Sequence, residues 1–197
     1  MLSPAFFARS SNEVAPDLIG KILWSPGIGG GRLTEVEAYL PAGDPASHAA
    51  SGPTRRNAAM FGRPGTIYVF LSYGVHYLVN IVCDREGVGS AVLIRALEAL
   101  DGSPGPTLKD ANVAGVSPMS YCGPGRVGTA LQIEPRLNGA LLGLASGLFV
   151  VDDGFKVEVS VDSRIGISRG AALPLRYYAR GSKCVTRRSR TRGGPCA

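Results

Sequence analysis

The chain has 197 residues, of which 45% are hydrophobic and 18% charged, a composition that is typical of one globular domain and excludes a disordered chain. The formal net charge of +6 favours a polyanionic partner such as nucleic acid only slightly, because many basic proteins bind none. No segment has the ~20 apolar residues of a membrane helix, and the first residues lack the pattern of a secretory signal, so we expect no secretion and no membrane partner.

Short elements separated by turns are expected throughout, because the chain contains 27 glycines and 14 prolines. Proline at the first helical position predicts a helix from Ser3–Pro4, and Gly20 ends a second helix over residues 14–19. A third helix is predicted over residues 125–132. Strands are predicted over residues 21–24, 32–40, 66–71, 76–83, 91–97, 148–152, 156–161 and 173–178.

The connections indicate how these strands join. The glycine-rich residues 27–31 lack the spacing of a dinucleotide-binding loop and predict a hairpin turn. Residues 72–75 predict a hairpin with a tyrosine at its tip, and Asp153–Gly154 predicts another between residues 148–152 and 156–161. We therefore expect a single α+β domain over residues 1–186, built on a curved, open-barrel-like antiparallel sheet with short helices and a protruding hairpin. Residues 187–197 form a basic tail.

The cysteine pattern gives no sign of a metal site or of a disulfide framework. There are four cysteines and two histidines, and no two cysteines form a C-x-x-C pair. Free thiols in a reducing compartment are the prediction. The cysteines are Cys83, Cys122, Cys184 and Cys196.

The strand over residues 32–40 places two carboxylates and a tyrosine together. Side chains alternate between the two faces of a strand, so Glu35, Glu37 and Tyr39 share one face with Leu33. The other face, the predicted core side, consists of Thr34, Val36, Ala38 and Leu40. One interpretation is a solvated strand face. The other is a carboxylate that deprotonates water beside an aromatic side chain.

A single arginine interrupts the apolar run of residues 91–97. A buried guanidinium without a partner is costly, which predicts that Arg95 pairs with a carboxylate. One interpretation is an ordinary salt bridge. The other is that Arg95 holds Glu37 ionised and helps to position an attacking water, and the two interpretations are compatible.

Aromatic residues are concentrated over residues 65–80. Tyr68 and Tyr77 fit a core position. Tyr73 lies beside Gly74 in a turn, where an exposed aromatic side chain on a basic protein could wedge between base pairs. Asn80 lies in an apolar stretch, so its amide needs partners; it is either a structural bridge or a group that reads base edges.

These segments together resemble the alkyladenine (3-methyladenine) DNA glycosylase family. The similarity extends over residues 3–186, and its motifs occur in the family order, which is far more specific than any one of them. The matching segments are 34–39, 44–48, 55–57 with 60–61, 65–80, 93–98, 123–126, 163–167 and 174–178.

The resemblance implies a role for each matched residue. Glu37 corresponds to the general base, and Arg95 and the backbone carbonyl of Ile165 would help to hold the nucleophilic water. Tyr73 would fill the gap left in the duplex, and Asn80 would exclude normal guanine. The base pocket would be lined by Tyr39, His48 and Phe70, and the phosphate contacts would be Arg55, Arg126 and Arg164.

The resemblance also implies the reaction. A monofunctional enzyme would flip damaged purines out of double-stranded DNA and hydrolyse the glycosidic bond by direct water attack, because no lysine lies in the matched active-site segments to form a Schiff base. It would need no metal or organic cofactor, act as a monomer, and work in the cytoplasm (the bacterial nucleoid) or the nucleus. Phe70 and Ser72 depart from the family pattern and affect the expected lesion preference.

Three other classes compete with this interpretation. A damaged-DNA-binding module of the same fold would need no Glu37. An acyl- or formyl-transfer domain would explain neither the hairpin tyrosine nor the glutamate strand. A Ser/His/Asp hydrolase is disfavoured because the chain has no G-x-S-x-G motif.

Overall fold

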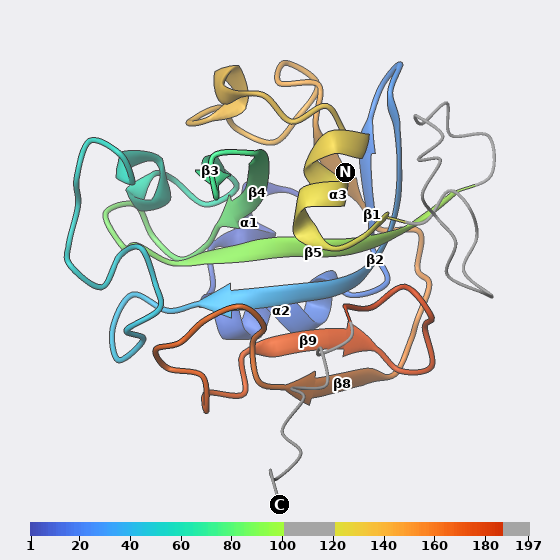
Figure 1. The fold of residues 1–197 in the computed structure, drawn as a ribbon. Helices are drawn as coiled ribbons and strands as arrows, with labels where there is room; N and C mark the ends of the chain where they lie inside the picture. Colours follow the sequence, from blue (N-terminus) through green and yellow to red (C-terminus); the bar gives the residue numbers. More distant parts are fainter. Residues whose placement is uncertain (101–120, 187–197) are drawn as a thin grey trace, which may run out of the picture.

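Nine strands of the described residues form one curled antiparallel sheet, a half-barrel with few helices around it (Figure 1). The computed structural model describes residues 1–100 and 121–186. The strands are β1 (Ile22–Ser25), β2 (Gly29–Tyr39), β3 (Ile67–Ser72), β4 (His76–Val82), β5 (Ala91–Ala99), β6 (Tyr121–Cys122), β7 (Phe149–Val151), β8 (Val159–Asp162) and β9 (Arg176–Ala179). The helices are α1 (Pro4–Phe7), α2 (Ser11–Leu18) and α3 (Pro124–Ala130), with 3-10 turns η1 (Ala58–Phe61) and η2 (Pro135–Leu137).

Strands β2 and β5 form the centre of this sheet. One edge of β2 pairs with β5, and the other pairs first with β1 and then with β9. Strand β5 pairs in turn with β4 and β6, while β3 and β7 continue the sheet at its two sides. The predicted fold class, α+β on a curved antiparallel sheet, is confirmed.

A bulge with one extra residue on each strand interrupts the β2–β5 ladder where the functional residues lie. Leu33 pairs with Leu97 and Glu35 with Ala96, and Val36 then pairs with Ile94, so the register skips Thr34 on β2 and Arg95 on β5. Each extra residue reverses the alternation of faces along its strand.

Because of this bulge, the predicted assignment of β2 side chains to the two faces of the sheet is wrong at Leu33. Leu33 lies with Val36 and Ala38 in the main core, although strict alternation assigned it to the opposite side. Glu35 and Glu37 are completely buried, so a solvated strand face is also wrong.

The helices and the glycine-rich turn follow from local chemistry. The Glu13 carboxylate accepts a hydrogen bond from the Ser10 N–H and caps the start of α2, and Gly20 follows its end with φ +87°. The β1–β2 hairpin confirms that residues 27–31 connect strands. A Cβ at Gly30 would lie 2.0 Å from the Leu23 carbonyl oxygen, so only glycine permits this close approach.

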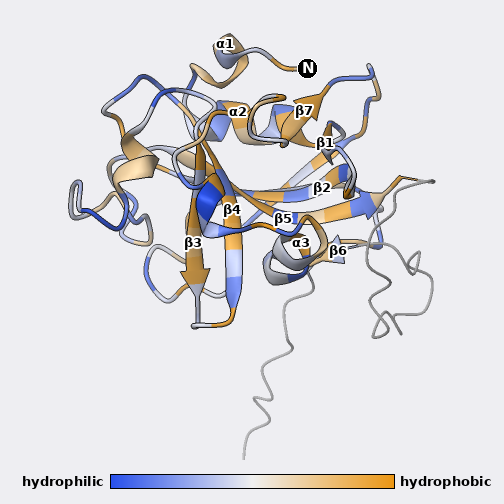
Figure 2. Ribbon diagram, turned by 90° about the horizontal axis from the view of Figure 1, so that it is seen from above, coloured by the Kyte–Doolittle hydropathy of each residue, from blue (hydrophilic) through white to orange (hydrophobic). Residues whose placement is uncertain are grey.

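Apolar side chains from the strands and from α1, α2 and α3 meet in one main core. Hydrophobic residues follow β3 and the central strands, whereas the connecting loops are more hydrophilic (Figure 2). A second, smaller cluster lies under the loop that follows β2 and contains Ala49, Met60, Tyr68, Val82 and Ala91. No helix in the described ranges is long and apolar enough to cross a membrane.

The predicted hairpin between residues 148–152 and 156–161 is wrong. Strand β7 pairs with β1, and β8 pairs with β9. Ion pairs explain the difference, because Asp152 binds Lys21 at 2.9 Å and Asp153 binds Arg32 at 2.7 Å. These contacts anchor the connecting residues on the β1–β2 hairpin.

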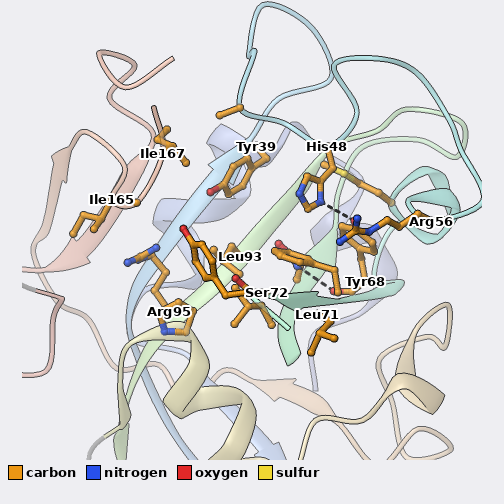
Figure 3. Close-up of a pocket in the computed structure, with 18 residues that line it drawn as sticks. Tyr39, His48, Arg56, Tyr68, Leu71, Ser72, Leu93, Arg95, Ile165 and Ile167 are labelled. Atoms are coloured by element: carbon orange, nitrogen blue, oxygen red, sulfur yellow. Dashed lines mark hydrogen bonds between the residues drawn. The ribbon is translucent and has the colours of Figure 1, made fainter. Parts of the chain in front are cut away.

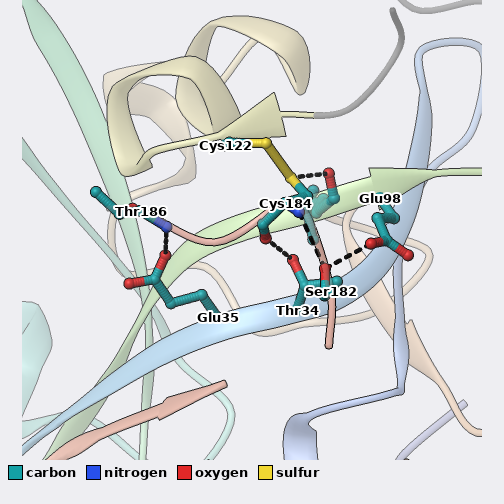
Figure 4. The surroundings of a disulfide bond; sticks show 8 residues. Thr34, Glu35, Glu98, Cys122, Ser182, Cys184 and Thr186 are labelled. Atoms are coloured by element: carbon teal, nitrogen blue, oxygen red, sulfur yellow. Dashed lines mark hydrogen bonds between the residues drawn. A yellow bond between two sulfur atoms is a disulfide. The ribbon is translucent and has the colours of Figure 1, made fainter. Parts of the chain in front are cut away.

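The prediction of free thiols is wrong for one pair of cysteines. Cys122 and Cys184 form a disulfide (Figure 4). The sheet brings them together, because Cys122 pairs with Ala96 of β5 and the Cys184 sulfur lies 3.3 Å from the Leu97 carbonyl oxygen. Their separation of 62 residues gives no sequence signal for this meeting. Cys83 is free and buried, whereas Cys196 and the whole basic tail, residues 187–197, lie outside the described residues.

Candidate active site

A pocket of about 430 Å³ opens between β2, the β3–β4 hairpin and the loops around residues 46–60 and 165–167 (Figure 3). This volume suits a small organic ligand. Of the predicted residues, its lining includes Tyr39, His48, Phe70, Tyr73, Asn80, Arg95 and Ile165. The sheet therefore brings together segments that are more than 120 residues apart in sequence.

Glu37 lies directly behind this lining, completely buried. Its Oε1 accepts the Ile165 N–H at 2.8 Å. Its Oε2 accepts the Tyr39 hydroxyl at 3.0 Å and lies 3.1 Å from Arg95 Nη1. Three groups that line the pocket thus contact this one carboxylate. The predicted pairing of Arg95 with a carboxylate is confirmed.

Burial and hydrogen bonding act on Glu37 in opposite directions. Desolvation raises the pKa of the Glu37 carboxyl above its ordinary value, and the neighbouring charge of Glu35 raises it further. Arg95, the Ile165 N–H and the Tyr39 hydroxyl lower it, and burial prevails. Glu37 is therefore a stronger base than an ordinary surface glutamate, which suits a group that must remove a proton from water.

Aromatic side chains form one wall of the pocket. His48 Nδ1 lies 2.8 Å from the Tyr68 hydroxyl, and the His48 ring meets the Phe70 ring edge to face with centroids 4.6 Å apart. Tyr39 approaches from β2, a different part of the sheet (Figure 3). Desolvation, and then the charge of Arg56, lower the pKa of His48, which favours a neutral imidazole.

The two polar predictions for the hairpin have different outcomes. Asn80 is buried and donates its amide Nδ2 to the Tyr68 carbonyl oxygen at 3.1 Å, so it is a structural bridge that also lines the pocket. Tyr73 is 93% exposed at the tip of the hairpin, as predicted. Its φ of +49° is unusual for an aromatic residue, and this strained conformation directs a bulky side chain outward beside the pocket.

The chain matches the family model described as methylpurine-DNA glycosylase over residues 5–183. It is also similar to proteins named "Putative 3-methyladenine DNA glycosylase". One from Rhodopseudomonas palustris (strain BisB18) is 45% identical, covering 94% of this chain and 90% of the relative. Those from Nitrobacter winogradskyi and Burkholderia orbicola are 43% and 42% identical, covering 98% and 92% of this chain and 90% and 89% of the relatives.

The chain belongs to the methylpurine-DNA glycosylase family. It is therefore an enzyme, a DNA glycosylase that hydrolyses N-glycosyl bonds, and DNA is its substrate. This membership favours an enzyme over the non-catalytic binding module and over the transferase and serine-hydrolase alternatives. Among residues 1–100 and 121–186 of the glycosylase, no group of three or more His, Cys, Asp or Glu side chains is placed to hold a metal ion.

One predicted phosphate contact of the glycosylase is wrong. The Arg164 side chain is completely buried, with its Nη atoms 2.5 and 2.6 Å from the Asp44 oxygens. Its guanidinium stacks 4.6 Å from the centroid of the Tyr39 ring. Burial raises the pKa of Asp44, but the hydrogen bonds from Arg164 and the backbone outweigh it and lower that pKa. Arg164 thus supports the pocket wall from behind.

The roles of the remaining predicted residues stay predictions. Arg55 and Arg126 are exposed, and Pro124, two residues before Arg126, lines the pocket. At Ile165 the contact with Glu37 is made by the N–H group, whereas the prediction concerned its carbonyl oxygen.

Several residues of the site had no assigned role in the sequence analysis, among them four that are polar or charged. Tyr68 and Arg56 line the pocket, and Glu35 and Arg176 form a buried ion pair behind Arg95. Arg176 is the single charged residue in the apolar run of residues 173–178, as Arg95 is in that of residues 91–97. A buried arginine needs a carboxylate partner, so two arginines in apolar runs predict two buried carboxylates. This argument could have identified Glu35 as the second one.

Proposed function

We propose that this glycosylase flips alkylated purines out of double-stranded DNA as a monomer and hydrolyses their glycosidic bonds with Glu37 as general base. One observation carries the proposal: a fully buried glutamate contacts three groups that line an aromatic pocket. The names of the relatives support 3-methyladenine as a substrate, and 7-methylguanine shares its positive charge. Hypoxanthine and ethenoadenine are further candidates within the same pocket.

The reaction is a direct displacement by water. Water loses a proton to the Glu37 carboxylate as its oxygen attacks C1′ of the sugar, and the base leaves with the electron pair of the glycosidic bond. The sugar passes through an oxocarbenium-like state, which the negative carboxylate stabilises. Arg95 and the Ile165 carbonyl hold the water. A cationic alkylated purine becomes neutral as it leaves and needs no general acid.

Recognition depends on the charge and shape of the extruded base. Cationic purines stack favourably on aromatic faces, which Tyr39, Phe70 and a neutral His48 provide. Asn80 opposes the exocyclic amino group of normal guanine. Tyr73 occupies the gap left in the duplex and holds the flipped state, as wedge residues do in other proteins that distort DNA.

The decisive experiment is a base-release assay on alkylated duplex DNA with the wild type and Glu37→Gln. We expect the variant to lose at least about a hundredfold in single-turnover rate, the usual contribution of a general base, with unchanged DNA affinity. Glu134→Gln alters an exposed carboxylate and serves as the matched control. Equal rates for Glu37→Gln and the wild type would remove Glu37 from the mechanism. Binding without release by the wild type would favour the non-catalytic module.

A further inference from the structure

A second buried glutamate shares the arginine that contacts Glu37. Arg95 Nε lies 3.1 Å from Glu35 Oε1, while its Nη1 lies 3.1 Å from Glu37 Oε2. Both carboxylates are completely buried. One planar guanidinium therefore spans the two, with its Nε edge on Glu35 and its terminal edge on Glu37.

Glu35 is held on several sides and is not available to the substrate. Its Oε1 also accepts Arg176 Nη1 at 2.9 Å, and its Oε2 accepts the Thr186 N–H at 2.6 Å (Figure 4). Among the described residues the pocket lining includes Arg95 but not Glu35. Glu35 can therefore influence the reaction only through its neighbours.

The segment that holds Glu35 is itself anchored. Cys184 lies two residues before Thr186 and forms the disulfide with Cys122. Its backbone carbonyl oxygen also accepts a hydrogen bond from the Thr34 hydroxyl at 2.7 Å. Figure 4 shows this segment, residues 182–186, crossing above β2 beside Glu35. The position of Glu35 is thus fixed from the strand below and the segment above.

The bulge explains why Arg95 needs such an anchor. The register skips Arg95, so the regular pleat of the ladder does not set its side-chain direction. A guanidinium is planar, and holding its Nε edge fixes the direction of its other N–H groups.

The negative charge of Glu35 opposes the ionisation of Glu37, the proposed general base. Its charge adds to the desolvation that raises the pKa of Glu37. Arg95 and Arg176 offset this charge, and Asp162 shares Arg176 at 2.9 Å. The cluster therefore has three carboxylates around two guanidinium groups. Two of these carboxylates, Glu35 and Glu37, are completely buried, and burying such charges is costly unless the ion pairs have good geometry.

We propose that Glu35 is a positioning residue. It fixes the guanidinium of Arg95 so that this group faces Glu37 and the attacking water. This inference rests on the proposed function of Glu37. It assigns Glu35 no contact with DNA, with the base or with the attacking water. Its loss should therefore slow the chemical step and leave substrate affinity unchanged.

A double-mutant cycle between Glu35 and Arg95 tests the proposal under single-turnover conditions. Glu35→Gln should lose on the order of tenfold to a hundredfold in rate, the effect of slightly misplacing a group that holds the reactants, with the same Kd for lesion-containing duplex. In an Arg95→Lys background, which has no guanidinium to orient, the same substitution should lose no more than about twofold. Glu98→Gln is the matched control, since Glu98 contacts the anchored segment at Ser182, at 2.5 Å, and should keep the wild-type rate.

Two results would overturn the proposal: a wild-type rate in folded Glu35→Gln, or the full loss repeated in the Arg95→Lys background. If Glu35→Gln does not fold, Glu35→Asp keeps the charge, shortens the side chain and takes its place in the same cycle with the same outcomes. Failure of the proposed function would look different, because the wild type would then release no base or Glu37→Gln would be fully active.

Discussion

Burial of Glu37 opposes the ionisation of its carboxyl group. Its pKa is raised, with desolvation as the main cause, and the carboxylate is the form that can accept a proton from water. If Glu37 is the proposed general base, we expect activity to be lost as the pH falls through this pKa. Because the pKa is raised, this loss should occur at higher pH than for an ordinary glutamate with a pKa near 4.5. The acidic limb of the rate profile is the measurement that reports it.

Tyr39→Phe should move that acidic limb further towards neutral pH. The Tyr39 hydroxyl donates to Glu37 at 3.0 Å and lowers its pKa, so removing the hydroxyl should raise the pKa of Glu37. Stacking on the ring is retained. Single-turnover rates measured across pH test this, with Tyr77→Phe, outside the described pocket lining, as control. A limb that stays in place or moves to lower pH would contradict the assignment of Glu37.

The β3–β4 hairpin is the element that reaches outward beside the pocket. We expect Tyr73→Ser to weaken binding to lesion-containing duplex more than it slows the reaction of bound DNA, because stacking of an aromatic ring on bases contributes about 1–3 kcal/mol. Phe155→Ser is a matched control, since Phe155 is also an exposed aromatic residue, 48% accessible, but outside the hairpin. Unchanged affinity and unchanged flipping in a fluorescent-base assay would show that Tyr73 is not the wedge.

Elements with local signals were predictable from sequence, and contacts between distant segments were not. Tyr73 and Gly74 lie in a turn that the local sequence predicts. The predicted strands on either side of it agree with β3 and β4 to within a residue or two. The bulge at Thr34 and Arg95 depends on how two strands pair, so strict alternation misplaced Leu33. Arg164 was misassigned for the same reason, because its partner Asp44 is 120 residues away.

At the scale of the whole molecule, the disulfide joins the C-terminal end of the described chain to β6, the short strand that pairs with β5. Reducing Cys122–Cys184 reopens a loop of 62 residues in the unfolded chain, which should lower the free energy of unfolding by about 2–4 kcal/mol. Urea denaturation with and without dithiothreitol measures the loss. Cys122→Ser should show the lower stability in both conditions, whereas Cys83→Ser should retain the response to the reductant. A wild type indifferent to the reductant would contradict the bond.

We expect the basic tail at residues 187–197 to contribute to DNA affinity through its charge. The tail contains four arginines and no acidic residue, so its deletion removes four charges from a net +6. Binding of each phosphate by a cation releases counterions, and the slope of log K against log salt should fall by roughly 0.9 for each phosphate that the shortened chain no longer neutralises. Replacing the four arginines with lysine should preserve the slope, because the charge remains. The base-release rate at saturating DNA should be unchanged in both variants, since the tail lies outside the matched family segment, residues 5–183. A deletion that leaves the salt slope intact would show that the tail does not contact DNA.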